Sequence, residues 1–429
     1  MRLAPTLALA LVAPIAAVAP ATAGSQVDPE GATLSAWSVL PAETYVPGSE
    51  TSGHWTTGNA AVPAPYPGQP VQGFSGTHAL ADGSLVVLSD NGFGAKAISA
   101  DFLLSVHRIT PETDDADGAG ETSYDETLFT FSDPDRLVPW TTWRDGGCAA
   151  AASAGTLPAG YTCPAPDRKL TGWDFDPESI QRAADGTWWV GEEFGPFLLH
   201  LSSDGALLEP PIPTPGVKSL SNPTLAAGET ANLANSKGYE GLAVTPDGRT
   251  LHPMLEGAIA EDKAAGLDAD LRIYTVRDGA FQDGFLRYRM QSEQHALGDF
   301  IMVNRHEALV IERDNLQGDA ARFKRIYLAD LRDRDGDGYV SKRLLVDLMD
   351  VANPEGLGGF GDPFTFPFWT IEDVEILDRR TIAVMNDNNF PATGGRSATV
   401  PDPNEYVVIT LAEPLKVDRR LLPLRTDEP

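Results

Sequence analysis

Five segments with the pattern of a β-hairpin recur along the chain, and this repeat restricts the possible folds more than any other feature. Four of them align closely on their turns: residues 73–92, 176–195, 238–257 and 371–390. The first three carry Asp-Gly between two apolar runs, and the fourth carries Asp378-Arg379-Arg380 there. Asp-Gly in this setting favours a two-residue hairpin turn, because both turn residues need positive φ. A looser fifth copy has its turn near Arg305-His306.

Each hairpin also carries oxygen-bearing side chains at the end remote from its turn. A two-residue turn fixes which residues face each other across the strands. The predicted pairs are Ser75 opposite Asp90, Glu178 opposite Glu193, Glu240 opposite Leu255 (next to Glu256), and Glu372 opposite Asp387. In the fifth copy, Glu312 or Asp314 occupies the return position. We therefore expect acceptor side chains from several hairpins at the same end of the sheets.

The spacing of the hairpins predicts an all-β fold of the β-propeller type. The hairpins start about 60–100 residues apart, and 41 glycines and 34 prolines supply turns. Antiparallel units that repeat with equivalent ends are typical of blades around an axis. We predict six blades, the last formed by the C-terminal strand NEYVVITL together with an N-terminal segment. Residues 24–429 then form one domain, with residues 112–170 as a loop-rich insertion on one face.

The N-terminus has the layout of a secretory signal peptide. Residues 1–23 contain Arg2, an apolar run and the small residues Ala21-Thr22-Ala23, which predicts cleavage before Gly24. No later segment has the roughly 18 apolar residues needed to span a bilayer. We expect an exported protein, either periplasmic or extracellular. Its two cysteines, Cys148 and Cys163, are then expected to form a disulfide.

The charge balance restricts the partners. The chain has 61 acidic and 32 basic residues, a formal net charge of −29. This balance argues against nucleic acid and anionic membrane surfaces and favours cations. We expect a monomer that acts on a small molecule.

A propeller would gather the acidic hairpin ends at one mouth of its central channel. Carboxylates that meet there need a cation or protonation to offset their repulsion. Oxygen ligands without His or Cys suit Ca²⁺ and disfavour zinc. The alternative is that these acids cap turns and face water. The predicted calcium ligands are Asp90, Glu178, Glu193, Glu240, Glu372 and Asp387, with Ser75 beside them.

A second calcium site is predicted in the segment DRDGDGYVSKRLLVD. Asp333, Asp335 and Asp337 precede Gly338, as at the start of a calcium-binding loop. The twelfth position is Leu344 rather than Glu, so an ordinary EF-hand is not expected. A plain Asp/Gly-rich turn is the alternative.

The chemistry that these residues favour is phosphoester hydrolysis. Glu178 and Glu240 are the candidate catalytic carboxylates, and Lys237, Arg305 and Arg313 are the candidate charge-neutralising residues. Each of these basic residues is equally compatible with an ordinary surface charge. The sequence has no Gly-x-Ser-x-Gly elbow, no His-Glu-x-x-His motif and no phosphate-binding Gly-Lys-Ser/Thr loop.

The hairpin segments resemble the family named for an esterase-like activity of phytase. The matching stretches include GFSGTHALADGSLVVLSDNGFG, DPESIQRAADGTWWVGEEFG, GYEGLAVTPDGRTL, NRHEALVIERDN, KRIYLADL and IEDVEILDRRTIAVMNDNNFP. The resemblance implies a propeller-like domain, close to the propeller phytases that hydrolyse phosphomonoesters with calcium. It also implies that PES at Glu178 and YEG at Glu240 correspond to the Glu-containing steps of such calcium channels.

Three functions follow as hypotheses. The leading one is a calcium-dependent phosphoester hydrolase. The second is a metal-dependent lactonase or carboxylester hydrolase of propeller type, with a Glu or Asp as base. The third is an exported binding propeller in which calcium is purely structural. Chromogenic phosphomonoesters and lactones, each assayed with and without chelator, separate the three.

Overall fold

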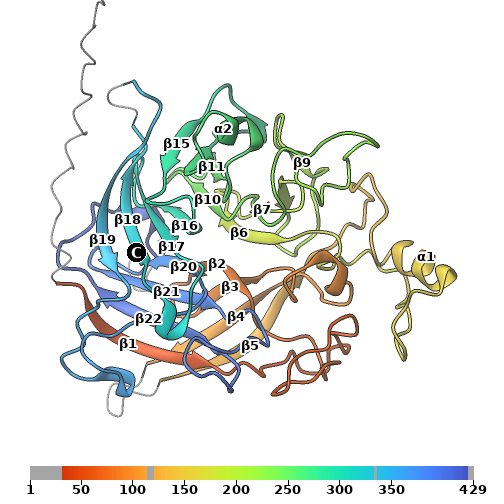
Figure 1. Cartoon of the computed structure of the whole chain (residues 1–429), viewed down its shortest axis with the longest axis horizontal. Helices are drawn as coiled ribbons and strands as arrows, with labels where there is room; N and C mark the ends of the chain where they lie inside the picture. Colours follow the sequence, from red (N-terminus) through yellow and green to blue (C-terminus); the bar gives the residue numbers. More distant parts are fainter. Residues whose placement is uncertain (1–30, 114–119, 333–335, 424–429) are drawn as a thin grey trace, which may run out of the picture.

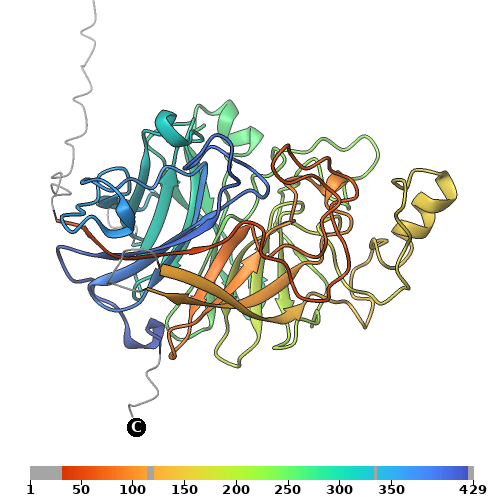
Figure 2. The ribbon, with the colours of Figure 1, turned by 90° about the horizontal axis from the view of Figure 1, so that it is seen from below.

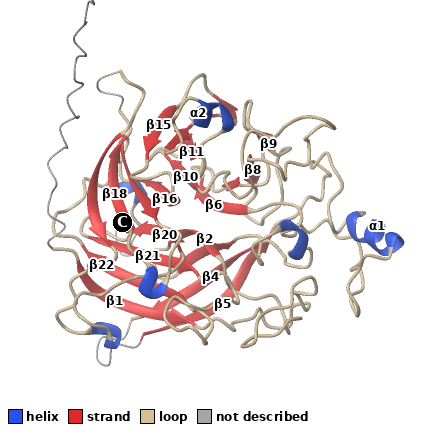
Figure 3. Ribbon diagram, in the orientation of Figure 1, coloured by secondary structure: helices blue, strands red, loops and turns tan. Residues whose placement is uncertain are grey.

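The structure, a computed structural model, describes residues 31–113, 120–332 and 336–423. Strands dominate these residues (Figure 3), which confirms the predicted all-β class. The helices in the described ranges are α1 (Gly147–Ala154), α2 (Ala260–Ala264) and the 3-10 turns Lys96–Ile98, Gly318–Ala320, Leu357–Gly359 and Arg419–Leu421. None of these helices is long and apolar enough to cross a membrane. The predicted signal peptide lies outside the described residues.

Antiparallel hairpins form a series of blades around a common centre (Figure 1). The first blade is β2 (Phe74–Ala79), β3 (Leu85–Ser89), β4 (Ser105–Glu112) and β5 (Gly120–Thr130). The second is β6 (Pro177–Arg182), β7 (Trp188–Glu192), β8 (Phe197–Leu201) and β9 (Ile212–Pro213). The third is β10 (Gly241–Val244), β11 (Thr250–Met254), β12 (Asp270–Ile273) and β15 (Leu286–Arg289), with the short β13 (Val276–Arg277) and β14 (Ala280–Phe281).

The other two blades come from the C-terminal half and the N-terminal strand. The fourth is β16 (Ala296–Met302), β17 (Glu307–Arg313), β18 (Lys324–Asp330) and β19 (Ser341–Asp347). The fifth is β20 (Thr370–Ile376), β21 (Thr381–Asp387), β22 (Asn404–Thr410) and β1 (Thr33–Leu40). The innermost strands contact one another in the closed order β2, β6, β10, β16, β20 and back to β2. This ring gives the described residues the architecture of a β-propeller.

The described residues form five blades, not the six that we predicted. The pairing behind the prediction is present, because β1 runs antiparallel to β22 from Thr33↔Thr410 to Leu40↔Asn404. These two strands do not make a blade of their own, however, since β22 also pairs with β21. They are the outer strands of the fifth blade. Strand β1 also pairs in parallel with β5 (Ser38↔Gly120 and Val39↔Glu121), so it joins the first and fifth blades in one eight-stranded sheet.

The predicted insertion at 112–170 is shorter than expected, because residues 120–130 form β5 of the first blade. The following segment, residues 131–176, leaves the blades and carries α1, which projects to one side (Figure 2). The predicted disulfide is present within it, joining Cys148 and Cys163 with a Cα–Cα distance of 5.8 Å. Residues 114–119, which belong to the predicted insertion, lie outside the described ranges.

Two local features shift the predicted hairpin register. In the first, second and fourth hairpins, the loops have three residues, closed by the N–H groups of Leu80, Ala183 and Leu377, which donate to Ser84, Thr187 and Thr381 O. Gly83 and Gly186 have φ of 88° and 87°, as expected at the left-handed position of a three-residue loop. The inner strands β2, β6, β16 and β20 also contain β-bulges, so an extra residue stands at the remote end of each.

The bulges contain the residues that we had paired across the strands. Glu178 lies in the bulge between Pro177 and Ser179, Glu372 lies in the one between Ile371 and Asp373, and Ser75 lies in that of the first hairpin. Asp90, Glu193 and Asp387 instead face Gly73, Asp176 and Thr370. The third hairpin has no bulge, and its register of Gly241 with Met254 confirms Glu240 opposite Leu255.

Hydrophobic clusters fill the spaces between neighbouring blades and fix the positions of the inner strands. One cluster joins the fourth and fifth blades through Ile311, Ile326, Val374 and Val407, all fully buried. Another joins the first and second through residues that include Leu88, Val106, Val190 and Leu199. The apolar residues alternate with inward-facing residues along the inner strands, as the pleat of a strand requires. The polar residues of the inner strands are thereby held toward the channel.

Candidate metal centre

Eight carboxylates from four blades gather where the inner strands begin. They are Asp90 of the first blade, Asp176, Glu178 and Glu193 of the second, Glu240 and Glu256 of the third, and Glu372 and Asp387 of the fifth. We call this set the carboxylate ring. All of them except the partly buried Asp90 are less than a tenth exposed. The bulges contribute to this gathering, because each turns an extra side chain toward the channel.

Within the ring, two groups of three carboxylates are spaced as cation ligands. One is Asp176, Glu178 and Glu193, and the other is Glu193, Glu240 and Glu256. In each group, one oxygen per residue lies within 4.8 Å of the others. Glu193 belongs to both. Its Oε1 is buried and has no hydrogen-bond partner among the described residues, which suits an oxygen that ligates a cation.

The fourth blade contributes a cation to the ring in place of a carboxylate. Arg313, at the end of β17 and 4% exposed, places one guanidinium nitrogen 3.0 Å from Glu372 Oε1, 3.5 Å from Glu240 Oε1 and 3.7 Å from Glu256 Oε1. Ser75 Oγ donates to the other oxygen of Glu372 at 3.1 Å. Arg313 therefore links the third, fourth and fifth blades at the mouth.

The carboxylates at the edges of the ring have polar partners. Asn91 Nδ2 donates to Asp176 Oδ1 at 2.7 Å. Asp90 Oδ1 accepts from the backbone N–H of Gly92, and Asp387 Oδ1 accepts from that of Asn389. On the opposite side, Lys237 Nζ pairs with Glu256 Oε2.

The ring carries more negative charge than its own side chains can offset. Burial, and then the charge of neighbouring carboxylates, raises the pKa of Glu178, Glu193 and Glu240 well above the usual range. Burial also raises the pKa of Asp176 to about 6, and burial with the charge of Glu372 raises the pKa of Asp387 to about 8. Among the described residues, the cations that form ion pairs with these eight carboxylates are Arg313 and Lys237. This environment favours either protonation or a bound cation, and an oxygen-only ligand set fits Ca²⁺.

The structure brings together most of the predicted site residues. Asp90, Glu178, Glu193, Glu240, Glu372, Asp387, Ser75, Lys237 and Arg313 all lie in or against the ring. Arg305 does not, because it lies exposed in the β16–β17 turn, at the opposite end of β17 from Arg313. Arg305 therefore lies outside the carboxylate ring.

The fifth hairpin also differs from the prediction. Neither Glu312 nor Asp314 enters the ring: Glu312 pairs with Lys342 and His295, and Asp314 pairs with Lys324 at 3.0 Å. Side chains alternate along a strand, so placing Arg313 in the channel turns both neighbours away.

The predicted second calcium loop is only partly described. Asp333 and Asp335 lie outside the described residues. Asp337 is exposed, and its Oδ1 accepts the backbone N–H of Tyr339 at 2.8 Å.

Sequence reasoning missed Asp176 and Glu256 as ligands. Both were adjacent to predicted positions, Asp176 at the start of DPES and Glu256 beside Leu255. A two-residue turn predicts Glu178 opposite Glu193. In the structure the residue that faces Glu193 is Asp176, whose carbonyl accepts the N–H of Glu193 at 2.9 Å. The run of acidic residues on both sides of the hairpin was the available signal.

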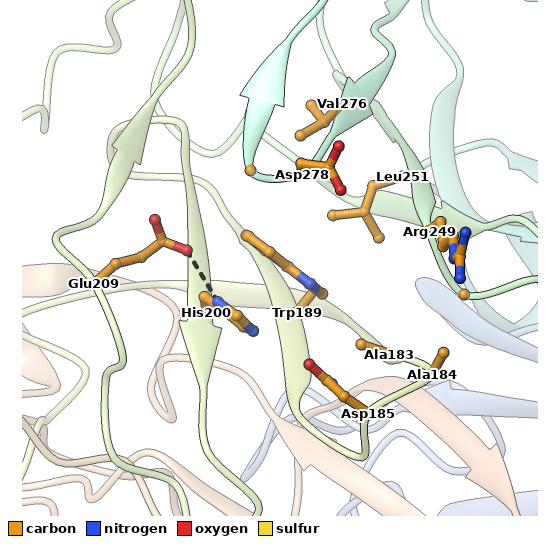
Figure 4. A pocket seen from close by; sticks show the side chains of 12 residues that line it. Ala183, Ala184, Asp185, Trp189, His200, Glu209, Arg249, Leu251, Val276 and Asp278 are labelled. Carbon is orange, nitrogen blue, oxygen red and sulfur yellow. Dashed lines mark hydrogen bonds and ion pairs between the residues drawn. The ribbon is translucent and has the colours of Figure 1, made fainter.

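Cavities lie both at the remote ends and at the turn ends of the hairpins. One of about 350 Å³ adjoins the ring and is lined by Lys237, Glu256 and His295, among others. Figure 4 shows another, of about 510 Å³, between the second and third blades, lined by Trp189, His200 and Glu209 and close to the turn residue Asp185. The latter and a larger neighbouring cavity of about 910 Å³ contain none of the ring carboxylates. They are at the turn ends of the hairpins, away from the candidate metal centre.

Comparison with known proteins adds a family match. A family model described as "Phytase-like: Esterase-like activity of phytase" matches residues 69–390. A protein from Arthroderma benhamiae described as an uncharacterized secreted protein is 29% identical over 192 residues, which cover 35% of this chain and 36% of that protein. The match thus spans about a third of the length of that relative.

Solved structures also resemble the chain, at low sequence identity. A gluconolactonase from Xanthomonas campestris is 14% identical, with a TM-score of 0.32 over 78% of this chain and 71% of that one. An aldose sugar dehydrogenase from Streptomyces coelicolor, in its PQQ-bound form, is 12% identical, with a TM-score of 0.34 over 79% of this chain and 94% of that one. These scores are too low to inform the function.

Proposed function

The chain belongs to the phytase-like family described by esterase-like activity of phytase, and we propose that it is an exported, calcium-dependent phosphomonoester hydrolase. The proposal assigns the chemistry to the carboxylate ring. It takes a small phosphorylated molecule as the substrate. Export is part of the proposal, supported by the signal-peptide pattern of residues 1–23 and by the disulfide between Cys148 and Cys163.

The observation that carries this proposal is the sharing of Glu193 between the two groups of ligands. Asp176, Glu178 and Glu193 form one, and Glu240 and Glu256 join Glu193 in the other. Sites with two metal ions stabilise the attacking and the leaving oxygen of an in-line displacement at phosphorus, and a carboxylate shared by two ligand groups would hold two such cations close together. The alternative lactonase, with one divalent ion and a Glu or Asp base, would need only one of the two groups, so the double arrangement favours the phosphoester.

The remaining residues of the ring suit an anionic substrate once cations are present. Calcium ions bound here would neutralise the phosphate oxygens and lower the pKa of a bound water. Glu178, Glu193 and Glu240 would hold the ions. Arg313 fixes Glu240 and Glu372 relative to each other through its guanidinium. Lys237, whose side chain is 38% exposed, stands where the ring meets solvent and can contact a phosphate oxygen.

Burial of the ring excludes most bulk water from these groups. Glu178, Glu193 and Glu240 are 9%, 3% and 5% exposed. Interactions between charges are stronger in such a site than in water. An anion can approach only where bound cations reverse the local potential, which makes binding of substrate dependent on metal.

The test is an assay of purified protein on p-nitrophenyl phosphate and on a simple lactone, each with calcium and with EDTA. We expect hydrolysis of the phosphoester with calcium, its loss in EDTA and its recovery when calcium is restored. Hydrolysis of the lactone alone would contradict the proposal and support the lactonase hypothesis. Calcium binding without activity on either substrate would leave a binding propeller.

A further inference from the structure

The cavity that adjoins the carboxylate ring contains an imidazole held by a buried carboxylate. This cavity, of about 350 Å³, lies between the third and fourth blades and shares Lys237 and Glu256 with the ring. His295, in the segment between β15 and β16, lines the same cavity. Its side chain is 14% exposed. A group in the cavity therefore has the ring on one side and His295 on another.

His295 is held in one orientation by Glu312 and Phe323. Its Nδ1 lies 2.9 Å from Glu312 Oε1, and its ring centroid lies 3.9 Å from that of Phe323. Because Nδ1 is occupied by the carboxylate, Nε2 is the nitrogen left to act in the cavity. This is the carboxylate–imidazole arrangement that fixes the tautomer and stabilises the imidazolium in acid–base catalysis.

Glu312 is itself fixed as an ionised carboxylate. It is fully buried, and its oxygens accept from Lys342 Nζ, Tyr288 Oη and the N–H of Gln291. Burial opposes ionisation of Glu312, but the hydrogen bond from His295 and the charge and hydrogen bond of Lys342 prevail and lower its pKa. The packing of β17 alone does not require a buried carboxylate with this many polar partners, one of which is a histidine beside the ring.

We propose that this cavity receives the leaving group of the substrate and that His295 donates the proton that the leaving oxygen needs. The proposal rests on the proposed phosphomonoesterase function. Water adds to phosphorus while the bond from phosphorus to the leaving oxygen breaks, and its electron pair stays on that oxygen. His295 acts in its imidazolium form: its Nε2 proton moves to this oxygen, which leaves as an alcohol, and the imidazole is left neutral with Nδ1–H on Glu312. His295 then regains a proton from the one that the attacking water releases, so the net reaction consumes one water and yields alcohol and phosphate.

The lining of the cavity indicates the class of leaving group. The charged residues of the lining are Lys237, Lys263, Glu256, Asp268 and Glu293. Met290 is the one large apolar side chain in this lining. A polyphosphorylated group would face three carboxylates there, whereas hydroxyl groups can bond to ammonium and carboxylate alike. The inferred substrates are phosphomonoesters of polar alcohols.

The test compares two leaving groups in the calcium-loaded full chain. Alkoxides need a proton when they leave, whereas p-nitrophenolate does not. For His295→Gln, we expect kcat/KM on glycerol 2-phosphate to fall at least about 100-fold, the usual range for losing a general acid. The loss on p-nitrophenyl phosphate should be at least about tenfold smaller. His306→Gln, in the exposed β16–β17 turn, is the matched control and should change neither value.

A second measurement does not depend on turnover or on a folded variant. In ¹⁵N-histidine-labelled, calcium-loaded protein, a non-hydrolysable hydroxyalkyl phosphonate should shift the Nε2 resonance of His295. The resonances of His306 should stay in place. The inference is overturned if the phosphonate binds without moving His295, or if His295→Gln lowers both substrates equally or not at all. If the wild-type protein hydrolyses neither phosphoester, the proposed function fails instead, and the phosphonate titration still decides whether the cavity binds.

Discussion

Arg313 lies 3.0 Å from Glu372, and this pair joins the last residue of β17, in the fourth blade, to the bulge of the fifth. The guanidinium is the one fully buried cation that faces the carboxylate ring among the described residues, since Lys237 is 38% exposed and Lys324 is directed to backbone carbonyls. Removing it leaves Glu240, Glu256 and Glu372 without their shared partner. Breaking a buried ion pair from one side usually costs about 3–5 kcal/mol.

Arg313→Met should therefore lower the free energy of unfolding of the metal-free protein by about 3–5 kcal/mol. Denaturant unfolding in EDTA measures this change. Arg305→Met is the matched control, because Arg305 is exposed at the far end of the same hairpin and should change stability little. Equal, small effects of the two substitutions would show that Arg313 does not neutralise the ring.

The metal-free protein should become less stable as pH rises from about 4 to about 8. The raised pKa values of Asp176 (about 6) and Asp387 (about 8) mean that the folded state holds protons that the unfolded state has released. The stability that these groups contribute is fully present below their unfolded pKa values and is lost as pH passes the folded ones. Between the unfolded and the folded pKa of each such group, the free energy of unfolding falls by about 1.4 kcal/mol per pH unit. Carboxylates with lowered pKa values, such as Asp262 and Asp270 beside arginines, act in the opposite sense only at lower pH.

Thermal unfolding in EDTA at pH 5 and pH 8 checks this dependence. Calcium should restore the stability at pH 8, where the ring is ionised, and should have little effect at pH 5. A protein that is more stable at pH 8 than at pH 5 without metal would show that the ring is not a cluster of uncompensated carboxylates.

Glu193→Gln should weaken calcium binding more than any other single change in the ring, because Glu193 belongs to both ligand groups. Glu178→Gln and Glu240→Gln each remove a ligand from only one group. Calorimetric titration of the three variants gives the number of ions and their affinities. Asp283→Asn, at an exposed position of the third blade, is the control. Similar losses for Glu193→Gln and Glu178→Gln would mean that the two groups do not share a ligand in solution.

The disulfide should stabilise the segment outside the blades. Cys148 and Cys163 are 15 residues apart, and closing a loop of about that length is worth about 3 kcal/mol in the chain-entropy model. Protein purified from an oxidising compartment should therefore contain no free thiol when unfolded without reductant. The double variant Cys148→Ser and Cys163→Ser should be less stable by up to this amount. Two titratable thiols in the unfolded, unreduced protein would contradict the pairing.

The sequence was sufficient for the repeat and for most of the ring, because periodic hairpins and acidic ends are local patterns. It was not sufficient for the register. The three-residue loops before Ser84 and Thr187 and the bulges at Glu178 and Glu372 each shift the pairing by one residue, and neither shift has a signature in the residue types alone. Asp176 was missed for this reason.

The blade count and the role of the fourth blade depended on long-range contacts. Whether β22 starts a new blade or completes the one with β21 depends on which strands pair. Strands β1 and β22 are too far apart in the sequence for a local pattern to predict their pairing. Likewise, the run Glu312-Arg313-Asp314 offers a carboxylate or a cation to the channel, and one residue of register decides which. The sequence did not indicate His295 as a candidate, because its partner Glu312 follows 17 residues later and the two meet only when β16 pairs with β17.

The central claim is that the carboxylate ring is a calcium centre in which Glu193 is shared. The most direct test is a crystal of the protein grown or soaked with calcium and measured for anomalous scattering. The account predicts at least two calcium ions at the mouth of the channel, one held by Asp176, Glu178 and Glu193 and the other by Glu193, Glu240 and Glu256. A crystal saturated with calcium in which no ion contacts Glu193 would contradict it.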